Sequence, residues 1–214
     1  MVIYENVSKI YNEPYCEAVK DFSSHIKQGE FVALTGQSGS GKTTLLSMIL
    51  KEIEPSSGRV IVNGIDLATV NKSKLPKYRC QIGSVFQDFK LIEDIDAYEN
   101  VRLAYMLNGG RSKDESRRVS SIFSMLGIDA LHKRLPHQMS GGEQQKVCMA
   151  RAIVNQPGLL IADEPTGNLD PKSSEEIFSL LKLINMQRIT VIMATHDLDA
   201  VARLGCRVIN LDKE

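Results

Sequence analysis

Residues 36 to 43 form a pattern that binds phosphate. They read GQSGSGKT and fit G-x-x-x-x-G-K-[ST] at each fixed position. The glycines let backbone N–H groups turn toward phosphate oxygens, and the following helix adds the positive end of its dipole. Lys42 would reach the β- and γ-phosphates, and the Thr43 hydroxyl would coordinate Mg²⁺. We therefore expect a nucleotide site formed by Gly36, Ser38, Gly39, Ser40, Gly41, Lys42, Thr43 and Thr44.

Two carboxylates follow the apolar run 159–162. Asp163 can hold Mg²⁺ through water. Glu164 comes one residue later, outside the strand, where a carboxylate near the γ-phosphate can orient or deprotonate an attacking water. A plain strand-to-turn boundary is the competing interpretation, and the complete phosphate loop in the same chain makes it the weaker one.

Two further polar residues follow short apolar strands. His196 comes after the run 190–194. If that strand neighbours the strand that leads to Glu164, both side chains emerge at the same carboxyl edge of the sheet, where ligands bind in open α/β folds. Gln87 follows the run 82–86. Its amide oxygen could reach the metal while its loop reports occupancy to a helical insert.

A second anion-binding pattern lies at residues 139 to 145, which read MSGGEQQ. Ser140 and Glu143 have the spacing of a capping box, which is sufficient to start the helix-like run that follows. A chain that already has a complete phosphate loop needs no second phosphate-binding segment for its own nucleotide. We therefore expect Ser140 and Gly142 to face the γ-phosphate of a second copy of the chain.

The hydrophobic pattern predicts an α/β fold. Continuous apolar runs suit central parallel strands that helices cover on both faces, and Asn63-Gly64 after a β-branched run indicates a hairpin. We expect a P-loop NTPase core with an N-terminal antiparallel β portion and an inserted α-helical subdomain. The expected strands are 31–35, 59–64, 82–86, 159–162 and 190–194, and the expected helices are 43–50, 98–131 with a break at 108–110, and 173–184.

Length and composition favour a single domain over 1–214. We assign 1–87 and 159–214 to the nucleotide-binding core and roughly 88–158 to the helical subdomain. Lys plus Arg and Asp plus Glu number 26 each. This balance gives no indication of nucleic-acid binding. The local basic run 71–79 is compatible with a phosphate or lipid contact, and we favour a solvated loop face because the whole domain has no excess of positive charge.

The four cysteines form no C-x-x-C pair, which is typical of reduced thiols in a cytosolic protein. The N-terminus shows no secretory signal, and no apolar stretch approaches the ~20 residues needed to cross a bilayer. Any membrane role must therefore come through a partner.

Other P-loop proteins fit less well. A small GTPase would read guanine with N-K-x-D, and Asn71-Lys72 lacks the Asp. A kinase for small metabolites remains formally possible, but it does not explain the pattern at 140–142.

Together these residues resemble the ATP-binding-cassette (ABC) ATPases over essentially the whole chain. The likeness rests on the phosphate loop, Gln87, Ser140 to Gln144, Asp163-Glu164, Asn168 to Asp170 and His196, which occur in that family's order. It implies ATP and Mg²⁺ as ligands, with Thr43, Gln87 and Asp163 at the metal and Glu164 and His196 as catalytic residues. It also implies that Tyr11 stacks on adenine, and that Ser140, Gly141, Gly142, Glu143 and Asp170 reach the partner's ATP.

The resemblance further implies a head-to-tail homodimer in the ATP-bound state and an integral-membrane, permease-like partner. The expected location is cytoplasmic, peripheral on the inner face of the cell membrane. Residues 86–91 and 162–171 favour the cell-division branch, with an FtsX-like partner, over ATPases of lipoprotein release and drug or peptide export. A soluble clamp on DNA or the ribosome is the less favoured alternative, because 44–139 leaves no room for a long coiled coil and the net charge is zero.

Overall fold

The computed structural model describes residues 1–212, which form two β-sheets and seven α-helices. A four-stranded antiparallel sheet has the order β2-β1-β4-β5, and a five-stranded parallel sheet has the order β6-β7-β8-β3-β9. The first contains β1 (Val2–Asn12), β2 (Tyr15–Ile26), β4 (Ser57–Val62) and β5 (Ile65–Asp66). The second contains β3 (Phe31–Thr35), β6 (Ile82–Phe86), β7 (Leu159–Asp163), β8 (Thr190–Ala194) and β9 (Arg207–Asn210).

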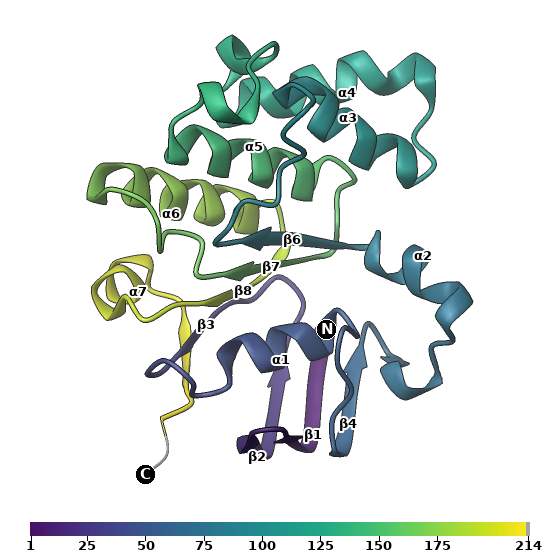
Figure 1. Cartoon of the computed structure of the whole chain (residues 1–214), viewed down its shortest axis with the longest axis vertical. Helices are drawn as coiled ribbons and strands as arrows, with labels where there is room; N and C mark the ends of the chain where they lie inside the picture. Colours follow the sequence, from purple (N-terminus) through teal and green to yellow (C-terminus); the bar gives the residue numbers. More distant parts are fainter. Residues whose placement is uncertain (213–214) are drawn as a thin grey trace.

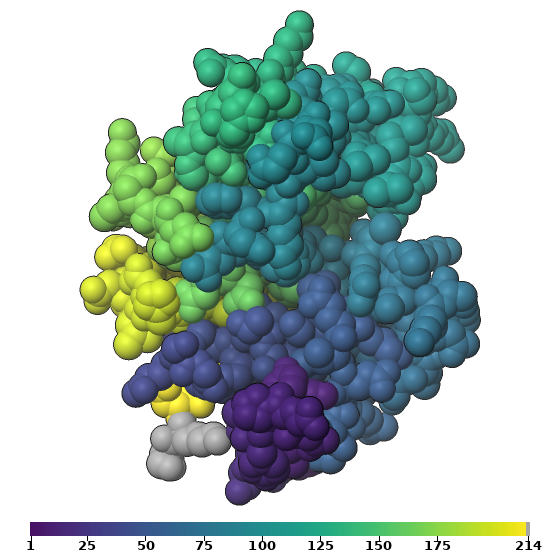
Figure 2. Space-filling view, viewed as in Figure 1, coloured from purple at the N-terminus to yellow at the C-terminus, as the bar shows by residue number. Residues whose placement is uncertain are grey.

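The helices cover the parallel sheet on both faces (Figure 1). Helix α1 lies between the parallel sheet and β1, β2 and β4, whereas α5 and α6 lie on the other face, with α3 and α4 beyond α5. In the space-filling view the N-terminal sheet and helices α3 and α4 occupy opposite ends of the molecule (Figure 2). The helices are α1 (Lys42–Ile49), α2 (Leu75–Arg79), α3 (Ala97–Leu107), α4 (Ser112–Leu126), α5 (Gly141–Ile153), α6 (Pro171–Met186) and α7 (Leu198–Leu204).

Two hydrophobic cores lie on the two faces of the parallel sheet. Because successive side chains of a strand point to opposite faces, Val32 and Leu34 of β3 join the core around α1, whereas Ala33 joins the core around α5 and α6. All three side chains are at most 1% exposed. Continuous apolar runs in the sequence thus become strands buried on both sides, which confirms the predicted α/β class.

The predicted strands and long helices are confirmed with small shifts at their ends. The strand predicted at 159–162 extends to Asp163, so Glu164 is the first residue beyond it. The predicted break at 108–110 separates α3 from α4. The short elements α7 and β9 were not predicted. β9 is four residues long and mostly exposed, so it lacks the apolar run of the central strands.

The prediction that 71–79 is a loop was wrong. The run contains a short 3₁₀ helix, Lys72–Lys74, and α2, and its lysines are exposed as expected. Tyr78 is buried, and its hydroxyl donates to the Ile49 carbonyl at 2.5 Å. Arg79 donates to the carbonyls of Leu50 (2.9 Å) and Lys51 (3.1 Å). These bonds satisfy carbonyl groups at the end of α1, which otherwise lack partners within the helix.

Helices α3 to α5 come between β6 and β7 in the chain and lie together on one side of the parallel sheet (Figure 1). Our division into a core (1–87 and 159–214) and a helical subdomain (88–158) remains an interpretation, and its last two residues lie outside the described part. Within residues 1–212, no helix has the length and apolar character needed to span a bilayer.

Candidate functional site

The phosphate loop connects β3 to α1. Gly41, the residue before α1, has φ +98°, and a Cβ there would lie 2.6 Å from the Ala18 carbonyl oxygen. Both facts require glycine at this position. No side chain caps α1 at its N-terminus, so the first-turn N–H groups are available to an anion. Lys42 is 7% exposed, and its Nζ donates to the carbonyls of Gly36 (2.7 Å) and Gln37 (3.0 Å).

Asp163 ends β7 opposite the start of α1. Its Oδ1 accepts a hydrogen bond from the Thr43 hydroxyl at 3.2 Å, which joins residues 120 positions apart in the chain. Burial raises the pKa of Asp163, and the bond from Thr43 opposes that shift only in part. The surroundings of Asp163 therefore disfavour its ionised form, and a nearby cation would stabilise that form.

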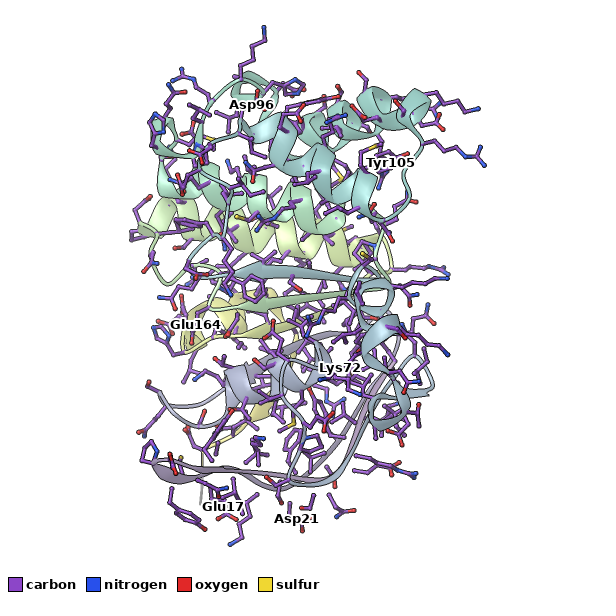
Figure 3. All side chains as sticks on the ribbon, turned by 45° about the vertical axis from the view of Figure 1, so that its right-hand side comes forward. Glu17, Asp21, Lys72, Asp96, Tyr105 and Glu164 are labelled. Atoms are coloured by element: carbon purple, nitrogen blue, oxygen red, sulfur yellow. The ribbon has the colours of Figure 1, made fainter. Side chains whose placement is uncertain are left out.

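Glu164 lies at the carboxyl edge of the parallel sheet (Figure 3). Its backbone has φ +46°, a left-handed conformation that is costly for a residue with a side chain. Its N–H donates to the Ala194 carbonyl of β8 at 3.0 Å. The strained conformation aims the side chain toward Lys42, whose Nζ lies 4.0 Å from Oε1.

His196 lies beside Glu164, as expected if their strands are neighbours. β7 and β8 pair directly, with Asp163 opposite Ala194. His196 Nδ1 lies 2.9 Å from Glu164 Oε2, and the His196 side chain is 70% exposed. The pair thus places an imidazole and a carboxylate at one open edge, where they can share or move a proton.

Gln87 follows β6 at the same edge and bonds to the segment that follows Glu164. Its Nε2 donates to Asn168 Oδ1 at 3.3 Å, and Asn168 Nδ2 donates to the Gln87 carbonyl at 3.2 Å. A Cβ at Gly167 would lie 2.9 Å from Gln87 Nε2, so glycine permits this close approach. The two loops therefore contact each other at the mouth of the site.

Helix α5 holds the loop after Gln87. Phe89 and Lys90 are consecutive residues with left-handed φ values of 56° and 51°. Arg151 donates to both of their carbonyls, at 2.8 Å to Phe89, and Cys148 Sγ lies 2.9 Å from the Phe89 carbonyl oxygen. Burial raises the pKa of Cys148 to about 12, so its thiol stays protonated and can donate.

These elements enclose one cavity of about 690 Å³. Tyr11 borders it from β1, and the Tyr11 hydroxyl lies 3.5 Å from Thr44 Oγ1. The ring is 37% exposed, so one part of it remains free to contact a ligand. The lining residues are Tyr11, Cys16, Ala18, Ser38, Gly39, Gly41, Lys42, Thr43, Thr44, Gln87, Glu164, Gly167 and His196.

Sequence reasoning missed four contributors to this region, one of which is Gly167 in the cavity lining. Cys16 and Ala18 border the cavity because β2 pairs with β1, with Cys16 opposite Tyr11. Asp212 Oδ1 accepts a hydrogen bond from the Gln37 N–H of the phosphate loop at 2.7 Å. β9 runs parallel to β3, so residues after β9 emerge beside the phosphate loop. Recognising β9 in the sequence would have suggested a further strand, and only its pairing with β3 places Asp212 at the loop.

The residues expected to act in trans do not line this cavity. Ser140 caps α5: its Oγ accepts from the Glu143 N–H at 3.3 Å, and Glu143 Oε2 accepts from the Ser140 N–H at 2.7 Å. The predicted capping box is therefore confirmed. Asp170 caps α6 and accepts from the N–H groups of Lys172 and Ser173, both at 3.0 Å.

The starts of α5 and α6 lie close together. A Cβ on Gly142 would lie 2.8 Å from Ser173 Oγ, so a side chain at Gly142 would separate the two helices. Ser140, Gly141, Gly142, Glu143 and Asp170 thus belong to one surface region formed by two helix N-termini. A helix N-terminus favours negatively charged groups, and the carboxylates of Glu143 and Asp170 already accept backbone N–H bonds there.

The donor set at the cavity fits a magnesium ion. Thr43 supplies a hydroxyl, Asp163 a carboxylate and Gln87 an amide, and all three lie at or beside the cavity. In residues 1–212, no group of three or more His, Cys, Asp and Glu side chains could hold a metal. Mg²⁺ is commonly bound through one or two carboxylates together with waters and phosphate oxygens, so a set with a single carboxylate suits it.

Asp163→Asn is expected to stabilise the ligand-free protein. The pKa of Asp163 is raised by burial, so its ionised form costs free energy above that pKa, and the cost disappears as pH falls toward the unfolded value of about 3.9. At pH 7.5 the variant should unfold roughly 1–4 °C higher than wild type in a thermal melt. The difference should shrink toward pH 4.

The control is Glu93→Gln, which removes one negative charge from an exposed side chain and should leave the melting temperature nearly unchanged. A melting temperature of Asp163→Asn at or below that of wild type at pH 7.5 would contradict the argument.

Comparison with known proteins gives the family. The family model described as ABC transporter matches residues 19–167. The cell division ATP-binding protein FtsE of Escherichia coli (strain K12) is 41% identical over 211 residues, covering 99% of this chain and 95% of that protein. FtsE of Mycobacterium tuberculosis (strain ATCC 25618 / H37Rv) is 42% identical over 211 residues, covering 99% and 92%.

Solved structures show the same fold. The ATP-binding cassette MJ0796, in a dimeric post-hydrolysis state bound to ADP and Pi, superposes with a TM-score of 0.89 at 38% identity and covers 99% of this chain and 94% of that one. CbiO1 from Clostridium perfringens, part of the ABC transporter complex cbiONQ, gives 0.88 at 31% identity, covering 98% and 83%. With the phosphate loop, the carboxylates and the histidine assembled in one cavity, the chain belongs to the ABC transporter family of ATP-binding cassettes and is an ATPase.

Proposed function

We propose that this ATPase works as a homodimer in which each ATP lies between the cavity of one chain and the α5 N-terminus of the other. One observation carries the proposal: Ser140, Gly141 and Gly142 present a helix N-terminus that lies outside the chain's own nucleotide cavity. A twofold dimer would bring each of these termini to the partner's cavity. The solved cassette MJ0796 is itself dimeric.

The residues of each cavity have different roles. The phosphate loop and Lys42 hold the phosphates, and Tyr11 contacts the adenine ring. Mg²⁺, held by Thr43, Asp163 and Gln87, would offset phosphate charge. Glu164 accepts a proton from the attacking water, and His196, 2.9 Å from its Oε2, orients that carboxylate and contacts the γ-phosphate. Lys42 bonds to two loop carbonyls without ligand, so it is already directed into the loop.

The proposed partner is an integral-membrane, permease-like subunit, with the ATPase peripheral on the cytoplasmic face. We place the contact on the loop 88–98 beside Gln87. Asn100 rigidifies this loop, because its amide exchanges hydrogen bonds with the Ile92 backbone at 2.9 and 3.1 Å. Ile92 is nevertheless 43% exposed. A rigid loop with an exposed apolar residue next to a ligand-contacting glutamine suits transmission of the nucleotide state to a partner.

The proteins to which this chain is similar indicate its biological role. Several curated relatives are cell division ATP-binding proteins, and the structural relative cbiO1 is part of an ABC transporter complex. We therefore propose an FtsE-like role, in which hydrolysis drives a signal through an FtsX-like membrane partner. In an exporter, the same cycle would move a lipid-linked or peptide substrate.

Glu164→Gln is expected to lower turnover about 10²- to 10⁴-fold, because the amide cannot accept the proton from water. ATP binding should remain, and the uncleaved nucleotide should stabilise a dimer detectable by light scattering after size exclusion. Glu52→Gln makes the same change at an exposed carboxylate after α1 and should hydrolyse ATP normally. Turnover of the Glu164 variant at the wild-type rate would rule out Glu164 as the base.

Mixing two inactive variants tests whether the sites are shared. Lys42→Ala removes the phosphate contact of a chain's own cavity, and Ser140→Arg blocks the cavity of its partner. In a mixed dimer both substitutions fall in the same site, so the other site is intact. Random mixing makes about half of the dimers mixed, and each has one of two sites, so up to about a quarter of wild-type activity should return. If each site were formed by one chain alone, mixing would recover none.

The membrane partner should co-purify with the tagged ATPase after mild detergent extraction. Ile92→Asp should lose the partner while retaining ATP hydrolysis, because Ile92 lies outside the cavity lining. Ile65→Asp is the matched control, since Ile65 is 41% exposed on β5 in the other sheet. Recovery of a division-related or an export-related membrane protein would separate the two roles. Recovery of nucleic acid without any membrane protein would favour the clamp.

A further inference from the structure

Glu164 has few backbone contacts that could hold its strained conformation. Its N–H donates to Ala194 and its carbonyl accepts from the Gly167 N–H at 3.1 Å. The next residue, Pro165, has no N–H, so its carbonyl is its only backbone hydrogen-bonding group. A left-handed residue relaxes unless its surroundings fix the chain on both sides. After these two bonds, the Pro165 carbonyl is the next backbone group on the C-terminal side that can hold the chain.

The partner of that carbonyl is Gln145 of α5. Gln145 is 0% exposed, and its Nε2 donates to the Pro165 carbonyl oxygen at 2.7 Å. Its Oε1 is buried and has no hydrogen-bond partner among the described residues. The amide thus bears the cost of burial for a single hydrogen bond, which is a poor arrangement for stability alone. The bond instead fixes a specific backbone position one residue after Glu164.

The helix that carries Gln145 is held in place by side-chain contacts. Helix α5 is fixed on its far side, where Arg118 donates to the Val154 carbonyl at 2.7 Å just beyond the helix end. Near its C-terminal end, Arg151 of α5 donates to the Phe89 carbonyl of the loop after Gln87. Movement of Gln145 relative to the sheet would therefore break contacts at both sites.

We propose that Gln145 is a positioning residue for Glu164. Its amide holds the Pro165 carbonyl, and this contact keeps Glu164 in the left-handed conformation that aims its carboxylate at Lys42 and His196. The inference rests on the proposed role of Glu164 as the base. Helix α5 then has two roles. In the proposed dimer its first turn faces the partner's ATP, and its Gln145 positions the base of its own chain's site.

The test is Gln145→Leu, which keeps the apolar volume and removes the donor. We expect kcat for ATP hydrolysis to fall about 10- to 100-fold, because displacing a reacting group by a fraction of an ångström has effects of this size. KM for ATP should stay within about twofold, since the phosphate loop is untouched. Hydrogen exchange at the N–H groups of Glu164 and Gly167 should accelerate.

Asn155→Leu is the matched control. Asn155 also donates from a side-chain amide to a backbone carbonyl, that of Ala104 at 2.9 Å, just past the end of α5 and outside the nucleotide cavity. It should lower thermal stability to a similar degree but leave kcat and the exchange at Glu164 unchanged. Equal kcat losses in the two variants would make Gln145 a residue of general stability and overturn the proposal.

The outcomes remain distinguishable from failure of the proposed function. If Glu164→Gln is inactive and Gln145→Leu hydrolyses ATP normally, only the positioning role is overturned. If Glu164→Gln hydrolyses ATP normally, the base assignment itself fails. Should Gln145→Leu not fold, Gln145→Met tests the same loss of donor, and failure of both to fold would also overturn the proposal.

Discussion

The alignment of four parallel strands at one edge is the constraint on which the site depends. β3, β6, β7 and β8 end together, so the phosphate loop, Gln87, Glu164 and His196 border one cavity, with Asp163 beside it, although they span most of the chain. The pairing of Asp163 with Ala194 fixes Glu164 beside His196. A shift of β7 by one residue would turn its side chains to the opposite face and remove the carboxylate from Thr43.

Helix α5 connects the parts that must change together. Its first turn is the second anion-binding region, Gln145 reaches the segment after Glu164, and Arg151 reaches the loop after Gln87. Both loops contain left-handed residues that carry side chains. Such conformations persist only where neighbouring contacts hold them. A rigid helix that contacts two strained loops therefore connects the geometry of both loops to its own position.

The polar groups buried near the site hold side chains and backbone in fixed positions, and their burial lowers the stability of the folded protein. Burial raises the pKa of Asp163, and the amide oxygen of Gln145 has no hydrogen-bond partner within residues 1–212. Lys42 is almost fully buried beside a loop whose carbonyls it contacts. A cation at the cavity would offset this cost at Asp163. The cost falls on the folded state before binding, which is common at sites that preorganise charge.

The sequence alone determined the central strands, the phosphate loop and the capping box at Ser140. Each depends on residues adjacent in the chain: apolar runs of strand length, glycine spacing before a helix, and a Ser-x-x-Glu pair. It also predicted that Glu164 and His196 would meet, provided that their strands were neighbours. It failed at residues 71–79, where a run of exposed lysines hid the buried Tyr78 and a helix that packs on the end of α1.

Only the tertiary structure decided the contacts between distant segments. Strand order brought β9 beside β3 and so placed Asp212 on the phosphate loop. Packing of α5 against the sheet placed Gln145 on the Pro165 carbonyl, and no local pattern distinguishes Gln145 from Gln144 beside it. No local pattern predicted the left-handed conformation of Glu164, because its contacts are made with distant elements: its own N–H bonds to β8, and a side chain of α5 bonds to the Pro165 carbonyl. Local propensity specifies elements, whereas such strained positions exist only after the elements have packed.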